Sequence, residues 1–243
     1  MKTKTIFAIT IITLVGIMIS MANRIHAKTN NKKMIAAITR YDVKKDSGKQ
    51  FQKALHTYVT NVLTDENNIM AEAYSEENNP EVLWVIERWN NKAGFDNAHK
   101  SSSFVAILSL SQNTLIKPAN TILVNDLEPL TKTQWRKTAE ASDTTLVIML
   151  FVDAKPGTEN TFKKVYHKAM PQFRSEPGVI NYQLSQFDND STQFVTYEKF
   201  RNDDAFQYHL KFPPIQPVID YLNTRIKKQP FQTGLHRLIA IKP

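Results

Sequence analysis

The sequence predicts an α+β protein in which two tandem βαββαβ domains pack sheet to sheet within one chain. The first observation is an internal repeat, because residues 34–97 align with residues 145–208 at a constant offset and without a gap. A repeat of this length forms a domain rather than a solenoid unit. The identical pairs are Asp42/Asp153, Lys44/Lys155, Phe51/Phe162, Lys53/Lys164, His56/His167, Ile69/Ile180, Asn78/Asn189, Glu87/Glu198, Asn91/Asn202 and Phe95/Phe206.

The second observation is that the same apolar helical face occurs in both copies. In both copies the apolar residues recur with the i, i+3, i+4, i+7 spacing of an amphipathic helix. Phe51, Ala54, Leu55, Tyr58, Val59 and Val62 in the first copy correspond to Phe162, Val165, Tyr166, Ala169, Met170 and Phe173 in the second.

The third observation is that runs 82–86 and 146–151 are apolar without alternation. An isolated ferredoxin-like sheet has one solvent-exposed face, so apolar and polar residues should alternate along its strands. The absence of alternation indicates that the second face is also covered. The other copy's sheet is the natural cover. We expect the contact to bury one of two alternating sets, either Leu146, Ile148 and Leu150 or Val147, Met149 and Phe151.

The remaining elements follow from periodicity and from turn residues. In copy one we expect strands at 35–43, 68–75, 82–89 and 121–127, a helix at 46–63 and a second helix at 91–99 that extends toward 104–110. In copy two we expect strands at 146–152, 179–186, 192–200 and 235–241, and helices at 157–174, 203–210 and 215–226. A polar linker should carry a short helix around 134–141.

The N-terminus has the pattern of a secretory signal peptide: Lys2 and Lys4, then an apolar run from Ile6 to about Ala22. Cleavage after Ala22 or Ala27 would export the mature protein to the periplasm or the medium, without stable membrane insertion. The alternative is an uncleaved anchor. The expected organisation is a signal peptide at 1–27, domain 1 at 33–127, a linker at 128–143 and domain 2 at 144–243.

Composition excludes several classes of site. The chain has no cysteine, which rules out disulfides, thiolate metal sites and a cysteine nucleophile. The formal net charge of +8 is scattered and partly in the leader, so no nucleic-acid site is expected. The sequence also lacks phosphate-binding glycine loops and histidine pairs with metal-ligand spacing, so neither a metal nor another cofactor is predicted.

The third strand and following helix of each copy resemble the antibiotic biosynthesis monooxygenase family of dimeric α+β barrels. In copy two the resemblance rests on the turn Glu176-Pro177-Gly178, on Glu198 and Phe200 ending the strand, and on His209 about three turns later. Copy one keeps Glu87, Trp89 and Phe95. It departs at Asn67, where copy two has Gly178, and its His99 lies one residue later than His209 does.

The resemblance implies that this chain forms internally the barrel that family members usually make from two subunits. It also implies cofactor-free oxygenation of a small aromatic or quinol substrate by dioxygen. On this reading His209 and Glu198 are the candidate catalytic residues, and Phe200, Phe206, Tyr182, Tyr197 and Trp89 are candidate substrate contacts. Glu87 and His99 are the equivalents in the other copy. The departures of copy one lead us to expect more of any catalysis from copy two.

Other interpretations stay open from the sequence. The histidines could be structural, each bonded to the glutamate of the neighbouring strand. The whole chain could be a non-catalytic module that binds a hydrophobic small molecule, or an isomerase that uses His209 or His99 for proton transfer. Haem degradation is not expected, since the segment 101–108 lacks the histidine of the haem-degrading relatives. Further self-association is also open.

Overall fold

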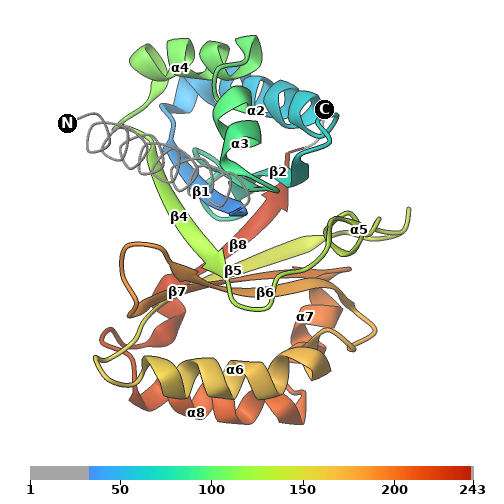
Figure 1. The fold of residues 1–243 in the computed structure, drawn as a ribbon, viewed down its shortest axis with the longest axis vertical. Coiled ribbons are helices and arrows are strands. Elements are labelled where there is room, and N and C mark those ends of the chain that lie inside the picture. Colours follow the sequence, from blue (N-terminus) through green and yellow to red (C-terminus); the bar gives the residue numbers. More distant parts are fainter. Residues whose placement is uncertain (1–32, 242–243) are drawn as a thin grey trace, which may run out of the picture.

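The computed structural model describes residues 33–241, and its eight strands close into a single antiparallel barrel. The predicted signal peptide lies outside the described residues. No helix within residues 33–241 is long and apolar enough to cross a membrane. Figure 1 shows the barrel between two helical layers, with the helices of copy one above and those of copy two below.

Copy one has the predicted βαββαβ order with its second helix split in two. Its strands are β1 (Ile35–Asp42), β2 (Asn68–Glu76), β3 (Val82–Trp89) and β4 (Asn120–Asp126). Its helices are η1 (Lys45–Ser47), α2 (Gly48–Val62), α3 (Lys92–Ala98) and α4 (Ser102–Thr114). The expected continuous helix breaks after α3 because Ser101 caps a new one, accepting a hydrogen bond from the backbone N–H of Phe104.

Copy two repeats this plan. Its strands are β5 (Leu146–Asp153), β6 (Val179–Phe187), β7 (Gln193–Phe200) and β8 (Leu235–Ala240). Its helices are α6 (Glu159–Phe173), α7 (Asp203–His209), η2 (Pro213–Ile215), α8 (Gln216–Thr224) and η3 (Phe231–Gly234). The repeated Asn91 and Asn202 have the same task, because each side chain caps the helix that follows it, α3 and α7 respectively.

The linker helix lies earlier than the sequence suggested, which corrects that prediction. Helix α5 spans Lys132–Trp135 and not a segment around 134–141. A capping box fixes its start, since the Thr131 hydroxyl accepts from the backbone N–H of Gln134 while the Gln134 side chain accepts from the N–H of Thr131. After Trp135 the chain leaves the helix, and the Arg136 side chain bonds to strand β2.

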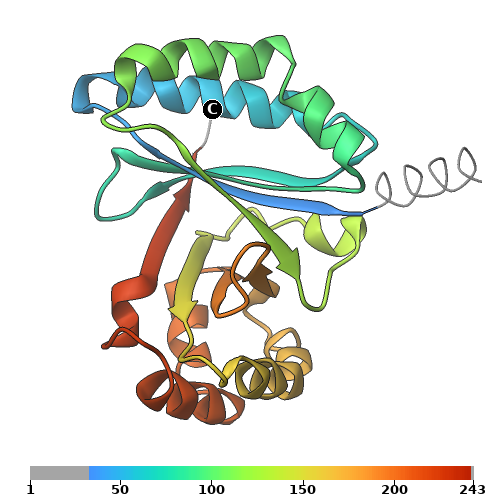
Figure 2. The same ribbon diagram turned by 60° about the vertical axis from the view of Figure 1, so that its left-hand side comes forward.

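The last strand of each copy closes the barrel against the other copy. Strand β4 pairs with β1 of its own copy and with β6, and β8 pairs with β5 and with β2. Figure 2 shows β4 and β8 crossing from one half of the molecule to the other. The strand order around the barrel is β1-β3-β2-β8-β5-β7-β6-β4, so the predicted intramolecular dimeric α+β barrel is confirmed.

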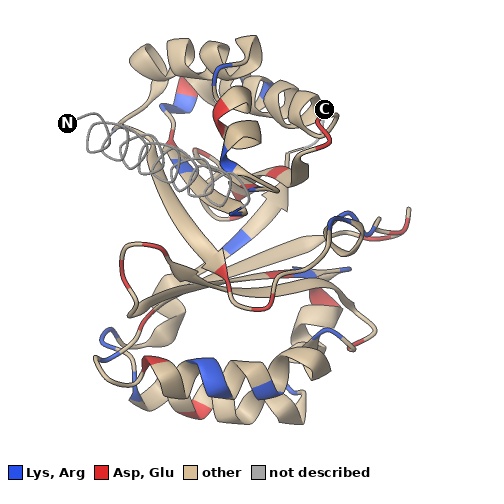
Figure 3. Cartoon of the chain, viewed as in Figure 1, with Lys and Arg blue, Asp and Glu red and all other residues tan. Residues whose placement is uncertain are grey.

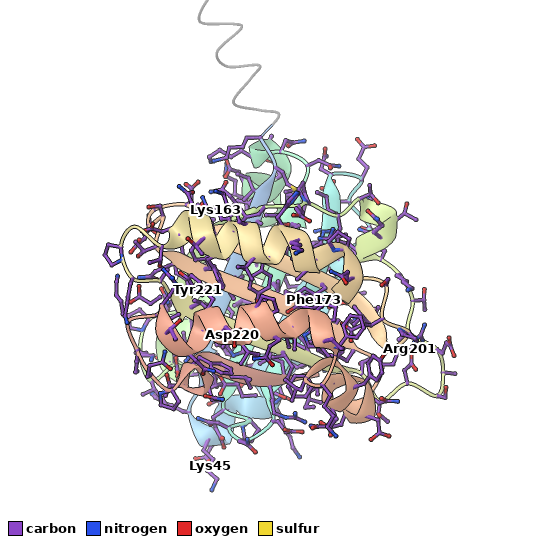
Figure 4. All side chains as sticks on the ribbon, turned by 90° about the horizontal axis from the view of Figure 1, so that it is seen from below. Lys45, Lys163, Phe173, Arg201, Asp220 and Tyr221 are labelled. Carbon is purple, nitrogen blue, oxygen red and sulfur yellow. The ribbon has the colours of Figure 1, made fainter. Side chains whose placement is uncertain are left out.

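The barrel interior uses the second of the two expected sets from β5. Val147 and Met149, with the partly buried Phe151, pack among side chains of both copies inside the barrel. Leu146, Ile148 and Leu150 instead face helices α6 and α8. Figure 4, seen from below, shows these two helices side by side in front of the sheet, and the labelled Phe173 and Tyr221 belong to this helix–sheet core.

Candidate functional site

Strand alternation divides the predicted site residues between two separate layers. On β7, Glu198 is packed beneath helix α7 with His209, and Phe200 belongs to the helix–sheet core. Tyr197, one residue from Glu198, belongs to the core inside the barrel. Because successive side chains of a strand point to opposite faces, Tyr197 and Glu198 cannot contribute to one pocket.

In copy two the predicted catalytic pair is sealed in the helix–sheet core. His209 is only 1% exposed, and its Nδ1 lies 2.8 Å from Oε1 of Glu176. Its Nε2 is 4.0 Å from Glu198, whose Oε1 accepts a hydrogen bond of 2.8 Å from the Tyr182 hydroxyl. Burial raises the pKa of the Glu198 carboxyl, against the opposing charge of His209. The direct partner of His209 is therefore the turn residue Glu176.

In copy one the equivalent glutamate is fully engaged. Glu87 accepts hydrogen bonds from the Tyr58 hydroxyl at 2.9 Å and from the Trp89 indole at 2.7 Å, and His99 Nε2 lies 2.8 Å from its other oxygen. The imidazole of His99 also stacks on Phe104, with ring centroids 4.1 Å apart. A carboxylate with three partners in an apolar layer is a satisfied structural group.

The other predicted substrate contacts are packing residues. Tyr182, Phe200 and Phe206 belong to the core under α6 and α8, and Trp89 belongs to the core under α2 and α4. All four are buried. The structure thus gathers most of the predicted residues into two helix–sheet cores, one per copy, without placing them around a common opening.

A pocket of about 480 Å³ opens elsewhere, between helix α2, strand β2, the end of β8 and the linker. We call it the linker pocket. Its walls are largely apolar, and its polar lining includes Glu72, Tyr74, Lys199 and Arg136. The apolar wall residues are Val59, Leu63, Met70, Ala71, Ala73, Trp135, Ala139, Ala240 and Ile241. Volume and lining are those of a small-molecule site.

Three side chains from both copies surround one carboxylate at the edge of this pocket. Glu72 accepts hydrogen bonds from the hydroxyls of Tyr74 and Tyr197, the latter at 2.6 Å, and from Lys199 Nζ at 2.6 Å. The two tyrosine hydroxyls lie 2.8 Å apart. Burial, followed by the Glu72 charge, raises the pKa of Tyr74 and of Tyr197 well above the ordinary value, so both stay protonated donors.

The repeat does not carry this cluster twice. At the equivalent positions, Glu72 is replaced by Gln183, Tyr74 by Ser185 and Lys199 by Arg88. Arg88 forms a two-point ion pair with Asp126 at 2.7 and 3.0 Å, and both side chains are almost completely buried. The Ser185 hydroxyl donates to the same carboxylate at 2.6 Å. At the position related by the repeat, Arg88 and Asp126 of copy one therefore make a closed ion pair with Ser185 of copy two, whereas Glu72 and Lys199 border a pocket.

Sequence reasoning missed Glu72 and Lys199. A glutamate inside an otherwise apolar stretch of β2 was a usable signal, the same one that singled out Glu87 and Glu198. Lys199 gave no signal, because its partner lies in the other copy and only closure of the barrel brings the two together. Among residues 33–241 no cluster of three or more potential metal ligands occurs.

The fold and the repeat together define a tandem dimeric α+β barrel. Residues 34–109 and residues 145–219 each match the antibiotic biosynthesis monooxygenase family. These two segments cover more than half of the chain, and the protein belongs to this family.

Solved structures show the same architecture at low sequence identity. A candidate monooxygenase from Fusobacterium nucleatum superposes with a TM-score of 0.74 and 16% identity, covering 86% of this chain and 93% of that one. One from Lactobacillus acidophilus gives 0.70 and 16%, covering 86% and 94%. An anthrone oxidase-like protein gives 0.60 and 7%, covering 86% and 92%. At such identities the likeness is one of fold.

A sequence relative is an uncharacterized protein of Synechocystis sp., 25% identical over 81 residues. The match covers 33% of this chain and 55% of that protein, so the chain spans about half the length of this relative.

Proposed function

We propose that this protein is a cofactor-independent monooxygenase of small phenols or quinols and that the chemistry takes place in the linker pocket. The observation that carries the proposal is the Glu72 carboxylate at the floor of an apolar pocket, surrounded by the hydroxyls of Tyr74 and Tyr197 and the ammonium of Lys199. Membership of the monooxygenase family supports the reaction class.

The residues supply what such a reaction needs from a protein. Glu72 accepts the phenol proton, and the resulting phenolate donates one electron to dioxygen. The two radicals combine at a ring carbon, and the proton returned from Glu72 completes a hydroperoxide. Loss of water leaves a quinone, so one oxygen atom stays on the ring and the other leaves with two substrate hydrogens. Lys199 and the tyrosine hydroxyls stabilise the negative charge that develops, and the apolar walls exclude water.

Oxygen uptake with a panel of quinols and hydroxynaphthalenes, with and without added metal or flavin, tests this proposal. Glu72→Gln should lower uptake by about 10²-fold or more if Glu72 is the base. Glu76→Gln is the matched control, because Glu76 lies on the same strand but pairs with His236 and Trp84 and does not line the pocket. No uptake with any substrate, or equal loss in both variants, would contradict the proposal.

A second candidate is binding without turnover in the same pocket. It is favoured by the contacts of Glu72, since both carboxylate oxygens are already engaged by Lys199, Tyr74 and Tyr197. Saturable binding of a quinol without oxygen uptake would select this candidate. An isomerase based on His209 or His99 has less support, because neither histidine lines the linker pocket.

We also propose that the protein acts outside the cytoplasm after removal of residues 1–22 or 1–27. The support is the sequence pattern of the leader alone. N-terminal sequencing of exported protein should return a start just after Ala22 or Ala27, and an intact Met1 would refute cleavage.

A further inference from the structure

We infer that the linker pocket selects an aromatic ligand that carries a carboxylate, and that the linker residues Arg136 and Trp135 hold this acidic group. The inference rests on the proposed function for the location of the site, and it adds the class of ligand. Three observations lead to it: the charge balance of the lining, the anchoring of Arg136, and an indole N–H without an acceptor.

The charge balance of the lining is positive. Its formally charged members are Arg136, Lys137 and Lys199 against the single carboxylate of Glu72. Lys199 is paired with Glu72, at 2.6 Å, so these two cancel. Arg136 and Lys137 are left as the excess charge at the linker side of the pocket, where Figure 3 shows basic residues around α5. A pocket with this excess favours an anion.

Arg136 is held in place without being neutralised. Its Nε donates to the carbonyl of Ile69 at 3.0 Å, and Nη2 donates to the carbonyl and side-chain oxygen of Asn68 at 3.0 and 3.1 Å. These carbonyls lie at an irregularity in β2, where the pairing with β3 shifts between Asn68 and Met70. All three acceptors are neutral, so the guanidinium is fixed and keeps its charge for a ligand.

The two acidic side chains that follow Arg136 in the linker are paired with another residue. Glu140 and Asp143 both pair with Arg201, at 3.1 and 2.8 Å. Within the part of the chain that the structure describes, no carboxylate pairs with Arg136. Arg136 and Lys137 therefore line the pocket, while the acids that follow them in the linker, Glu140 and Asp143, are held at Arg201.

Trp135 also lines this pocket and carries a buried donor. Its side chain is 2% exposed, and its indole Nε1 has no hydrogen-bond partner among residues 33–241. The ring is fixed from two sides, since the Arg88 guanidinium lies 4.1 Å from its centroid and Tyr197 contacts it edge-on at 5.4 Å. A buried N–H without an acceptor costs free energy that a ligand oxygen would recover.

Equilibrium binding tests the inference without depending on turnover. Isothermal titration calorimetry under argon compares 1-naphthol with 1-hydroxy-2-naphthoate, which differ by one carboxylate. We expect the wild type to bind the naphthoate at least about 10-fold more tightly at low ionic strength. High salt should reduce this preference, because the guanidinium is accessible to solvent. Equal affinities, or tighter binding of the naphthol, would overturn the inference.

Variants assign the effect to residues. Arg136→Gln should lower naphthoate affinity by about 10-fold and change naphthol affinity by less than about twofold. Trp135→Phe keeps a ring and removes the donor, and should lower naphthoate affinity by about 3- to 10-fold. Lys132→Gln is the matched control: the same linker and the same loss of charge, but a side chain bonded to the Glu66 carbonyl and outside the lining.

The outcomes separate this inference from the proposed function. Loss of the preference in Lys132→Gln as well would mean a general field effect and would overturn the role of Arg136. If Arg136→Gln melts markedly lower than wild type, Arg136→Lys replaces it and should retain part of the preference. A preference for the naphthoate without oxygen uptake refutes the oxygenase but not the ligand class, whereas uptake of neutral quinols without any preference refutes only the ligand class.

Discussion

Gly178 and Ala205 touch so closely that no second methyl group fits between them. A Cβ added at Gly178 would lie 2.3 Å from the Cβ of Ala205. In copy one the glycine is in the helix and not in the turn, because Asn67 replaces Gly178 and Gly94 replaces Ala205. A Cβ at Gly94 would lie 2.8 Å from Asn67. In both copies the turn before the second strand thus contacts the helix that follows the third strand. In each copy one of the two contacting residues is a glycine.

This contact predicts that Gly178→Ala destabilises the protein. We expect the free energy of unfolding to fall by about 1–3 kcal/mol, the usual effect of overpacking, as measured by urea denaturation. Adding Ala205→Gly should restore part of the loss, since it recreates the arrangement of copy one. Gly48→Ala is the control, because nothing lies within 4 Å of a Cβ at Gly48. Strict additivity in the double variant would contradict a direct contact.

The buried ion pair inside the barrel predicts a larger effect. Asp126→Asn should lower the free energy of unfolding by about 3–5 kcal/mol, because it leaves the Arg88 guanidinium buried without a counter-charge. Asp96→Asn removes one partner of the exposed Lys92–Asp96 pair and should cost less than about 1 kcal/mol. A loss at Asp126 as small as that at Asp96 would mean that water reaches Arg88.

The raised pKa of Glu198 predicts a pH-dependent effect of Glu198→Gln. The unfolded carboxyl loses its proton near its ordinary value of 4.5, whereas burial holds the folded carboxyl protonated to higher pH. The wild type therefore loses stability as the pH rises from about 4.5 through the folded pKa. Glutamine does not titrate, so the stability of Glu198→Gln relative to wild type should increase between pH 4 and pH 7. Urea denaturation at the two pH values measures it, and a difference that shrinks with pH would show that His209 and the hydrogen bonds from Thr196 and Tyr182 stabilise the charged form.

Substitutions of His209 and of Glu72 should affect different properties, the first stability and the second oxygen uptake. We expect His209→Gln to lower the melting temperature, because it breaks the contact with Glu176 in a closed core, while changing any oxygen uptake by less than about threefold. Glu72→Gln should instead lower oxygen uptake by about 10²-fold or more while changing the melting temperature little. Loss of uptake by about 10²-fold in a folded His209 variant would return catalysis to copy two, as the sequence first suggested.

Local pattern was enough to predict the fold but not the site. The repeat and the apolar face of α2 and α6 gave the architecture, since both depend on residues close in sequence. Which face of β5 enters the barrel stayed undecided, because Leu146 and Val147 are equally apolar. The linker pocket could not be foreseen. It joins Glu72 of β2, Lys199 of β7 and Arg136 of the linker, which meet only after the barrel closes.

Closure by β4 and β8 within one chain has a consequence for how the two halves can change. In a barrel made from two identical subunits every substitution appears twice, and stability depends on protein concentration through mass action. Here the last strand of each copy pairs with a strand of the other copy, and both copies belong to one chain. Unfolding should therefore be one transition whose midpoint does not depend on protein concentration. A substitution in one copy also leaves the equivalent position of the other copy unchanged. Of two places related by the repeat, one keeps the sealed Arg88–Asp126 pair and the other has Glu72 and Lys199 beside an opening, a difference that a dimer of identical subunits cannot have.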